Sequence, residues 1–347
     1  MTNSPSLYPL KFEPRLVDKL WGGRKLATVL GKPLPPGKLI GESWELYDFP
    51  PGVVGAGGSS DWISSRIATG PLAGRTLHEI VGEFGADLLG DVPLVGGHGQ
   101  FPVLIKFLDA REDLSIQVHP DRQYANANPG SHVKTEAWYV LQSDPGARLL
   151  NGLKPGVTRQ AFEAALRGGD VERLIRSIAA RSGDCFYLPS GTVHALGAGI
   201  LVAEVQTPSD TTFRVFDFNR IDPSTGKPRP LHVEQALRCI DFSGSVAGTS
   251  PDDPTSRLVT CPYFHLERFQ LAAGAERPAS PGPSVLIVIE GAVEIHCEQT
   301  DAPVTAVRGE VVLLAAALRH PLLGAGSSCT WLEVSLPAAG ETHAPET

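Results

Sequence analysis

The feature that most constrains the fold is the close spacing of turn-forming residues along the chain. The 347 residues include 37 glycines and 30 prolines, and these residues separate short apolar runs. Short runs bounded by Gly and Pro are typical of β-strands, whereas long helices need uninterrupted segments. We therefore predict a mainly β protein with a few short helices, whose strands form a sandwich or jelly-roll barrel.

The strand signals fall into two groups along the chain, which predicts two barrel-like units. Similarity between the groups is too weak to indicate a sequence repeat. The predicted organisation is an N-terminal segment that packs on the first unit (1–100), a first unit with a short helical insertion (101–230, insertion 158–180), a connecting segment (231–256), a second unit (257–337) and a tail (338–347).

Four segments have the pattern of short helices. Residues 76–89 place apolar side chains at helical spacing, and Thr76 and Glu79 have the spacing of a capping box. Residues 158–167 and 171–180 are predicted to form a helix pair separated by two glycines, and 232–240 a further helix.

Composition restricts the class of function. The net charge of −8 argues against a nucleic-acid-binding protein, because such binding depends on clustered Lys and Arg. A small anionic substrate needs only a few focused cations and remains compatible. The start of the chain lacks a signal-peptide pattern, no run reaches the roughly 20 apolar residues of a membrane span, and the five cysteines are widely spaced. We expect free thiols and a cytoplasmic location.

Three segments carry candidate metal ligands: Ser115–Asp121 (SIQVHPD), Lys134–Trp138 (KTEAW) and Gly183–His194 (GDCFYLPSGTVH). Alternation along a strand puts Ser115, Gln117 and His119 on one face. The third segment resembles the second cupin motif, in which a Pro-x-Gly turn aims a histidine into the barrel. The first two segments resemble the first cupin motif, with glutamine in place of its first histidine.

These resemblances predict one metal site built from four residues: Gln117, His119, Glu136 and His194. Taken singly, each residue is more often an ordinary surface or core side chain. Their joint occurrence at matched motif positions favours a site. Nitrogen and oxygen ligands suit zinc but also accept iron, manganese or cobalt.

At the family level the chain resembles the type I phosphomannose (mannose-6-phosphate) isomerases of the cupin superfamily, in their short bacterial subgroup. The most specific stretch is Gly183–Arg214, which contains PSGTVHALG and the spacing from Ser209-Asp210 to Arg214. The resemblance implies one Zn²⁺ per chain held by the four predicted ligands. It also implies interconversion of mannose 6-phosphate and fructose 6-phosphate through a cis-enediol.

The resemblance further assigns roles to five residues. Arg214 would stabilise the enediolate, and Ser115 and Lys106 would lie near the substrate phosphate. Asp210 is the candidate general base and Lys134 a second acid–base group, and the sequence leaves open which of them carries the proton. Without the resemblance, Asp210 and Arg214 could equally be a surface pair.

In the second unit, Glu294, His296 and His320 echo a metal motif, but the Pro-x-Gly turn is absent. We expect these histidines to be structural or exposed and this unit to be a packing partner without a metal site.

Three rival functions stay open: an iron dioxygenase, a non-enzymatic sugar-binding protein, and an isomerase of another sugar or sugar phosphate. The expected partner is a small sugar phosphate, and the chain is expected to be a monomer or weak homodimer.

Overall fold

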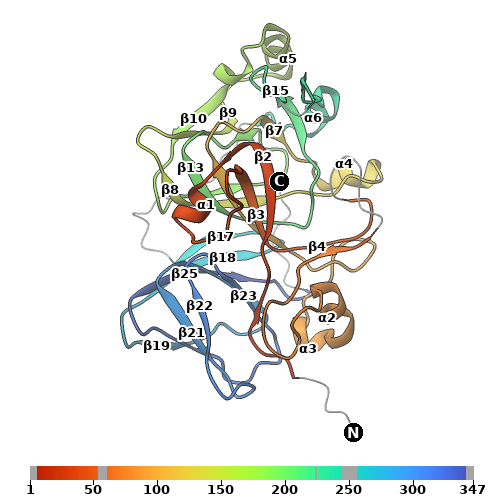
Figure 1. Ribbon diagram of the computed structural model, residues 1–347. Coiled ribbons are helices and arrows are strands. Elements are labelled where there is room, and N and C mark those ends of the chain that lie inside the picture. Colours follow the sequence, from red (N-terminus) through yellow and green to blue (C-terminus); the bar gives the residue numbers. More distant parts are fainter. Residues whose placement is uncertain (1–5, 54–60, 223–224, 244–255, 341–347) are drawn as a thin grey trace.

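The computed structural model describes residues 6–53, 61–222, 225–243 and 256–340, and it is mainly β. Two units, each a pair of antiparallel sheets, lie one above the other in Figure 1. The predicted mainly β class is therefore confirmed. Residues 244–255 of the predicted connecting segment and 341–347 of the predicted tail lie outside the described residues.

The first unit pairs a large sheet with a small sheet. In spatial order the large sheet contains β11 (Cys185–Leu188), β8 (Glu136–Ser143), β13 (Ile200–Gln206), β6 (Leu104–Ala110), β3 (Ile40–Leu46) and β2 (Arg15–Gly23). The small sheet contains β10 (Ile175–Ala179), β9 (Arg148–Leu153), β12 (His194–Ala195), β7 (Ile116–Val118) and β14 (Phe213–Phe216). Trp138, Val140 and Leu149 share one buried cluster between the two sheets.

The second unit repeats this arrangement with a more apolar interior. Its large sheet contains β1 (Leu10–Lys11), β23 (Val311–Leu314), β20 (Ser284–Glu290), β25 (Cys329–Ser335), β18 (His265–Leu271) and β17 (Arg257–Thr260). Its small sheet contains β19 (Glu276–Pro278), β24 (Leu322–Gly324), β21 (Ala292–His296) and β22 (Val304–Val307). Two-stranded ribbons join β4 (Asp48–Phe49) to β5 (Ile63–Ser64) and β15 (Ile221–Asp222) to β16 (Lys227–Pro228).

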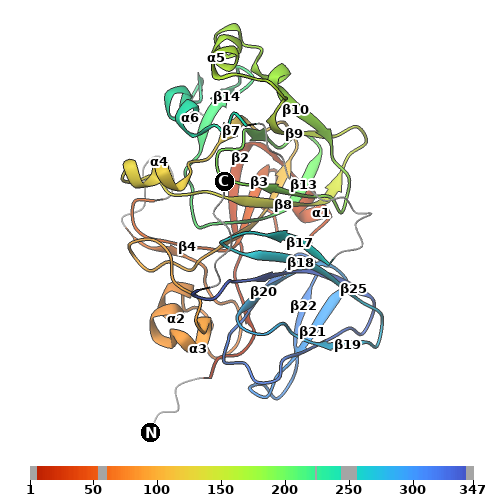
Figure 2. The same ribbon diagram turned by 180° about the vertical axis from the view of Figure 1, so that it is seen from behind.

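One hydrophobic core joins the two units. Ala137 and Tyr139, on the face of β8 opposite Trp138, belong to the same buried cluster as Leu266 and Val285 of the second unit. Figure 2 shows β17 and β18 between β8 and the remainder of the second unit. The first unit therefore uses one face of its large sheet for this junction and the other for its own interior.

The N-terminal segment contacts both units. Strands β2 and β3 extend the large sheet of the first unit. Strand β1, however, pairs with β23 of the second unit, Leu10 opposite Leu313. The backbone carbonyls of Asp87 and Leu88 also accept hydrogen bonds from the second unit, from Ala317 and Ala316.

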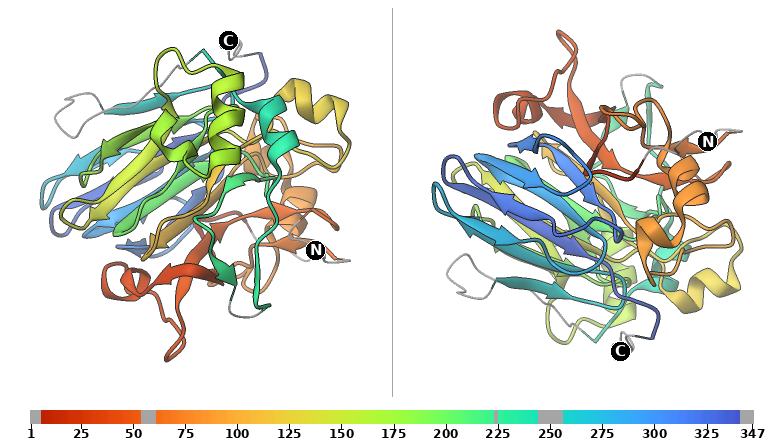
Figure 3. Two further views of the ribbon diagram at one scale, coloured as in Figure 1. Left: turned by 90° about the horizontal axis from the view of Figure 1, so that it is seen from above. Right: turned by 90° about the horizontal axis from the view of Figure 1, so that it is seen from below.

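The helices are short, as predicted. They are α1 (Lys25–Thr28), α2 (Leu77–Phe84), α3 (Ala86–Leu89), α4 (Arg122–Ala127), α5 (Arg159–Gly168) and α6 (Val233–Cys239). The capping box of Thr76 and Glu79 begins α2, and Gly85 with φ +45° separates α2 from α3. Figure 3 shows α5 and α6 on the outer side of the first unit. No helix in the described part of the chain is long and apolar enough to cross a membrane.

The predicted helix at 171–180 is wrong. Residues Val171–Leu174 form one 3₁₀ turn, and Ile175–Ala179 form strand β10, which pairs with β9. Ile175 and Ile178 satisfy a helical period, but these β-branched side chains also suit a strand. The free edge of the small sheet, which the sequence does not reveal, decides for the strand. The insertion is thus one helix followed by an edge strand.

Candidate active site

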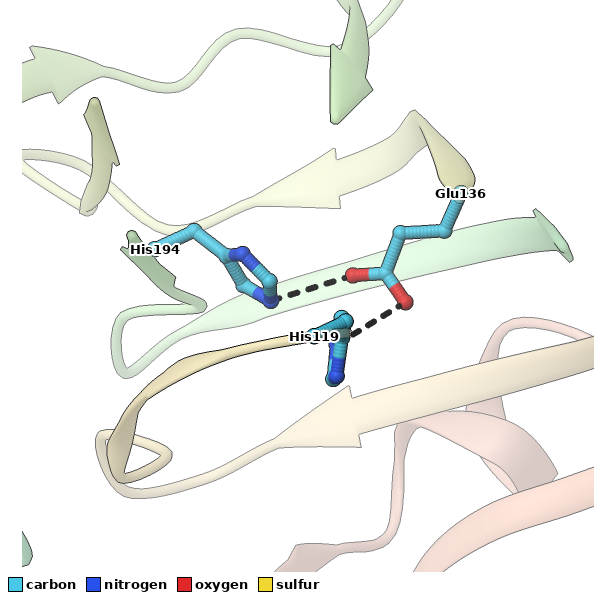
Figure 4. Close-up of side chains that lie close together, drawn as sticks. All are labelled: His119, Glu136 and His194. Atoms are coloured by element: carbon cyan, nitrogen blue, oxygen red, sulfur yellow. Dashed lines mark ion pairs between the residues drawn. The ribbon is translucent and has the colours of Figure 1, made fainter. Parts of the chain in front are cut away.

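Three predicted ligands converge in the interior of the first unit. Suitable atoms of His119, Glu136 and His194 all lie within 4.8 Å of one another, and the three residues are at most 1% exposed. Nε2 of His194 is 3.1 Å from Glu136 Oε1, and Nε2 of His119 is 3.5 Å from Oε2. Figure 4 shows the two imidazoles pointing at the two oxygens of the carboxylate.

The strand register explains this convergence. Gln117 on β7 is paired with His194 of β12 on one side and with Arg214 of β14 on the other. Glu136 starts β8 in the opposite sheet, so it reaches the group from across the interior. The fourth predicted ligand, Gln117, has its Nε2 3.3 Å from His194 Nε2. A half-turn of its amide would present oxygen instead of nitrogen, and the two orientations have the same shape.

Backbone contacts leave one nitrogen of each histidine facing the group. Nδ1 of His119 is 3.0 Å from the carbonyl oxygen of Thr211, and Nδ1 of His194 is 2.9 Å from that of Thr192. A hydrogen bond to a carbonyl needs the proton on Nδ1. Both Nε2 atoms are then unprotonated, which is the state that binds a metal.

The charges around these residues favour the protonation states that bind a metal, namely a neutral histidine and an ionised glutamate. Burial, together with the nearby Lys134 ammonium, lowers the pKa of His119 to about 3, so the imidazole is neutral at neutral pH. Burial alone would raise the pKa of Glu136, but the Lys134 ammonium beside it holds that pKa well below its usual range. Nζ of Lys134 is 2.9 Å from Glu136 Oε2 and 3.1 Å from His119 Nε2.

A cavity of about 420 Å³ opens beside this group. It brings together six of the predicted site residues, and the lining comprises Lys19, Trp21, Glu42, Val53, Lys106, Leu108, Leu114, Ser115, Gln117, Lys134, Glu204, Asp210, Thr211, Thr212, Arg214, Arg229, Pro230 and His232. Five lining side chains are Lys or Arg and three are carboxylates. The excess of cations suits an anionic substrate although the whole chain is acidic.

Arg214 lies at the rim of the cavity, next to the ligands in the sheet. Its Nε donates to Ser115 Oγ at 3.2 Å, and its Nη1 donates to the carbonyl of Pro230 at 3.0 Å. Burial and the neighbouring Arg229 lower the pKa of the Arg214 guanidinium. Arg214, Ser115 and Asp210 all line this cavity.

Lys106 sits deeper, within a network that the sequence analysis missed. Its Nζ is 3.0 Å from Glu204 Oε1, and Trp138 donates to the other oxygen of Glu204 at 2.7 Å. Glu42 forms an ion pair with Lys19 at 3.0 Å. Burial alone would lower the pKa of Lys106, but Glu204 and Glu42 outweigh burial and raise it. Side-chain alternation on β13 and β3 puts these glutamates in the interior. The sequence analysis missed them because an acidic residue on a strand is usually exposed and does not by itself indicate a site.

Trp21 both packs and lines the cavity. It is 3% exposed and belongs to the same buried cluster as Trp138. It also lines the cavity wall.

The residues fit a divalent metal. Both oxygens of Glu136 are buried; Lys134 pairs with Oε2 at 2.9 Å, whereas Oε1 has no hydrogen-bond partner of good geometry. A buried carboxylate oxygen without such a partner is costly unless a further positive group completes it. Two imidazole nitrogens, a carboxylate and an amide oxygen form a nitrogen–oxygen set that suits zinc and several other divalent ions.

The corresponding region of the second unit is different. His296 and Glu294 are 3.8 Å apart on β21 and each is more than 40% exposed, and His320 is 87% exposed. The described residues of this unit contain no group of three such ligands. The second unit thus exposes the residues that echoed a metal motif.

Comparison with known proteins identifies the family. Residues 10–146 match the family described as phosphomannose isomerase type I, catalytic domain. The chain is 33% identical to a mannose-6-phosphate isomerase of Streptococcus mutans over 300 residues, which covers 84% of this chain and 88% of the relative. This chain belongs to the type I phosphomannose isomerase family.

Other members of the family agree. Mannose-6-phosphate isomerase ManA of Bacillus subtilis is 33% identical over 290 residues, covering 82% of this chain and 86% of ManA. A crystal structure of the mannose 6-phosphate isomerase from Bacillus subtilis matches with a TM-score of 0.80 and 31% identity, over 94% of this chain and 99% of that chain. The similarity extends across both units and is not confined to the matched catalytic domain.

Proposed function

We propose that this chain interconverts mannose 6-phosphate and fructose 6-phosphate. The observation that carries the proposal is the buried group of His119, Glu136 and His194 beside a cation-rich cavity, in a chain that belongs to the type I phosphomannose isomerases. An aldose–ketose isomerase must stabilise an oxyanion and move a proton between adjacent carbons. The site offers cationic and proton-carrying side chains for both tasks.

We propose one zinc ion per chain, held by Gln117, His119, Glu136 and His194. Bound there, zinc would supply Lewis-acid polarisation of the substrate oxygens at C1 and C2. The Nε2 lone pairs fixed by the carbonyls of Thr211 and Thr192 support this donor set.

The remaining roles fall on residues of the cavity. Arg214 would place a fixed positive charge beside the cis-enediolate, an arrangement typically worth several kcal/mol when it is preorganised. Asp210 is the proposed general base, and Lys134 a second acid–base group close to the metal ligands. Ser115 and Lys106 are the proposed phosphate contacts, and both line the cavity.

We also propose a cytoplasmic enzyme that is a monomer or weak homodimer. All five cysteines are free thiols, which supports a reducing compartment. Analytical ultracentrifugation of the purified protein would determine the oligomeric state.

A coupled assay tests the proposed function. Formation of fructose 6-phosphate from mannose 6-phosphate should disappear after chelation and return when zinc is added. Free mannose and other hexose 6-phosphates, run in parallel, test the substrate class. Full turnover by protein shown to be free of bound metal would contradict the proposed mechanism, and turnover with a different sugar alone would contradict the proposed substrate.

A further inference from the structure

Three arginines, Arg214, Arg220 and Arg229, lie close to the buried carboxylate of Asp217. Asp217 follows β14, is 5% exposed and accepts from two guanidinium groups. Arg229 donates to both of its oxygens, from Nε to Oδ2 at 2.8 Å and from Nη2 to Oδ1 at 2.6 Å. Nε of Arg220 donates to Oδ1 at 3.2 Å. Burial alone would raise the pKa of Asp217, but these two arginines outweigh burial and lower it.

The backbone after Asp217 is specialised for this arrangement. Phe218 and Asn219 have φ of +52° and +55°, in the left-handed region that residues other than glycine seldom occupy. The turn they form is closed by the amide of Arg220, which donates to the carbonyl of Asp217 at 3.0 Å. Two consecutive residues of this kind are costly and persist where the surrounding structure requires them. Here they return Arg220 to the Asp217 carboxylate.

Local charge around the arginine cluster differs from that around Lys106. Lys106 pairs with Glu204 and Lys19 with Glu42, one carboxylate for each ammonium. Within the described residues, the ion pairs found for Arg220 and Arg229 are both with Asp217.

Two of these arginines, Arg214 and Arg229, line the cavity. Pro230, directly after Arg229, accepts from Arg214 Nη1 at 3.0 Å, which ties both side chains to the same rim. A phosphate monoester carries close to two negative charges at neutral pH and is recognised by planar guanidinium groups.

We propose that Arg229 is a further anchor for the phosphate group of the substrate and that Asp217 is its positioning residue. The bidentate contact with Asp217 fixes the plane of the Arg229 guanidinium, while Arg220 supplies the second positive charge that keeps the cluster cationic. Arg214 donates to Ser115, a proposed phosphate contact, so Arg229 beside it would complete the binding of the same phosphate group. This inference rests on the proposed function of the same site.

Substitution of Arg229 tests the anchor. In Arg229→Gln we expect KM for mannose 6-phosphate to rise by about tenfold to a hundredfold while kcat falls less, because one charge-assisted phosphate contact is lost. Calorimetric binding of mannose 6-phosphate and of inorganic phosphate should weaken by a similar factor. Arg229→Lys should recover part of the affinity, since it keeps the charge without the planar fork. Unchanged binding of both ligands in Arg229→Gln would overturn the proposal.

The matched control is Arg159→Gln. Arg159 is also an ion-paired arginine, bound to Glu163 on α5, but it does not line the cavity. Its KM and phosphate affinity should equal those of the wild-type protein. A similar loss of affinity in this control would show that the effect at Arg229 is not specific to the rim.

Substitution of Asp217 tests the positioning role. Asp217→Asn should raise KM in the same direction as Arg229→Gln, and the double variant should be little weaker than Arg229→Gln alone, because both changes act on one contact. Additive losses in the double variant would remove Asp217 from the proposal. If Asp217→Asn does not fold, Asp217→Glu provides the same comparison.

The binding measurements separate this inference from the proposed function. Wild-type protein that binds phosphate through Arg229 but shows no isomerisation would contradict the proposed function alone. Isomerisation of mannose 6-phosphate that is indifferent to Arg229→Gln in both KM and binding would contradict the further inference alone.

Discussion

The two units share an architecture and differ in what their interiors enclose. Each pairs a six-stranded sheet with a smaller one, but the first interior holds His119, Glu136 and His194, while the second is filled by apolar side chains such as Ile295 and Trp331. In the second unit Glu294 and His296 occupy the solvent-facing positions of β21. The same scaffold therefore becomes a site or a packing partner according to which strand face carries the polar residues.

Both units also bury glutamates beside tryptophans. In the first unit, Trp138 donates to Glu204 and Lys106 compensates its charge. In the second unit, Trp331 donates to Glu333 at 3.3 Å, and no ion pair is found for Glu333 within the described ranges. The two buried glutamates therefore differ in their surroundings: Glu204 pairs with a lysine and lines the cavity, whereas Glu333 does neither within the described ranges.

The largest expected effect comes from removing the ligand carboxylate. Glu136→Gln should abolish metal binding and lower kcat/KM by about 10⁴ or more, because the anionic ligand is lost in a buried site. Metal content by mass spectrometry and the coupled assay measure both quantities. Glu294→Gln in the second unit should leave both unchanged, and a loss of metal in that variant would show that the second unit also contains a site.

The next effect concerns catalysis without metal loss. Arg214→Ala should keep the metal and lower kcat by about 10²–10³, the range seen when one preorganised oxyanion contact is removed. Arg277→Ala is the matched control, because Arg277 stacks 3.7 Å from the centre of the Phe269 ring in the second unit. A wild-type kcat for Arg214→Ala would exclude Arg214 from the mechanism.

Substituting one buried glutamate in each unit compares how much the two glutamates contribute to the stability of the fold. Glu204→Gln leaves Lys106 with less compensation and should lower the free energy of unfolding by about 3 kcal/mol. Glu333→Gln keeps an oxygen that accepts from Trp331 and should cost less than about 1 kcal/mol. Urea midpoints of the two variants give the difference, and equal losses would mean that the ion pair at Lys106 adds nothing.

Acid should weaken the first unit through Glu42. Burial alone would raise the pKa of Glu42, but Lys19 and Lys106 outweigh burial and lower it to about 2. A group whose pKa is lower in the folded state contributes stability above its unfolded pKa and loses that contribution as the pH falls toward the folded one.

The loss should run from about pH 4.5 to pH 2 and amount to roughly 3 kcal/mol. Measured as unfolding free energy against pH, this part of the slope should be absent in Glu42→Gln. An identical slope in the variant would assign the acid sensitivity to other groups.

The motifs and the strand period allowed much of the site to be predicted. The Pro-x-Gly turn before His194 and the alternation around Gln117 depend only on local backbone rules, so they were visible in the sequence. The capping box at Thr76 is local in the same sense. The helix predicted at 171–180 failed because its pattern fits two local structures and a distant strand edge selected one of them.

The sequence by itself determined the mainly β class, because short apolar runs between turn residues follow from local chemistry, and the resemblance to the cupin motifs predicted the four candidate ligands. Only the tertiary structure decided that Lys106 is balanced by Glu204 and Glu42 and that Asp217 accepts from both Arg220 and Arg229. It also decided that β1 joins the second unit. These features depend on contacts between segments far apart in the chain, where the free energy of burial and of charge pairing is set by neighbours that no local pattern specifies.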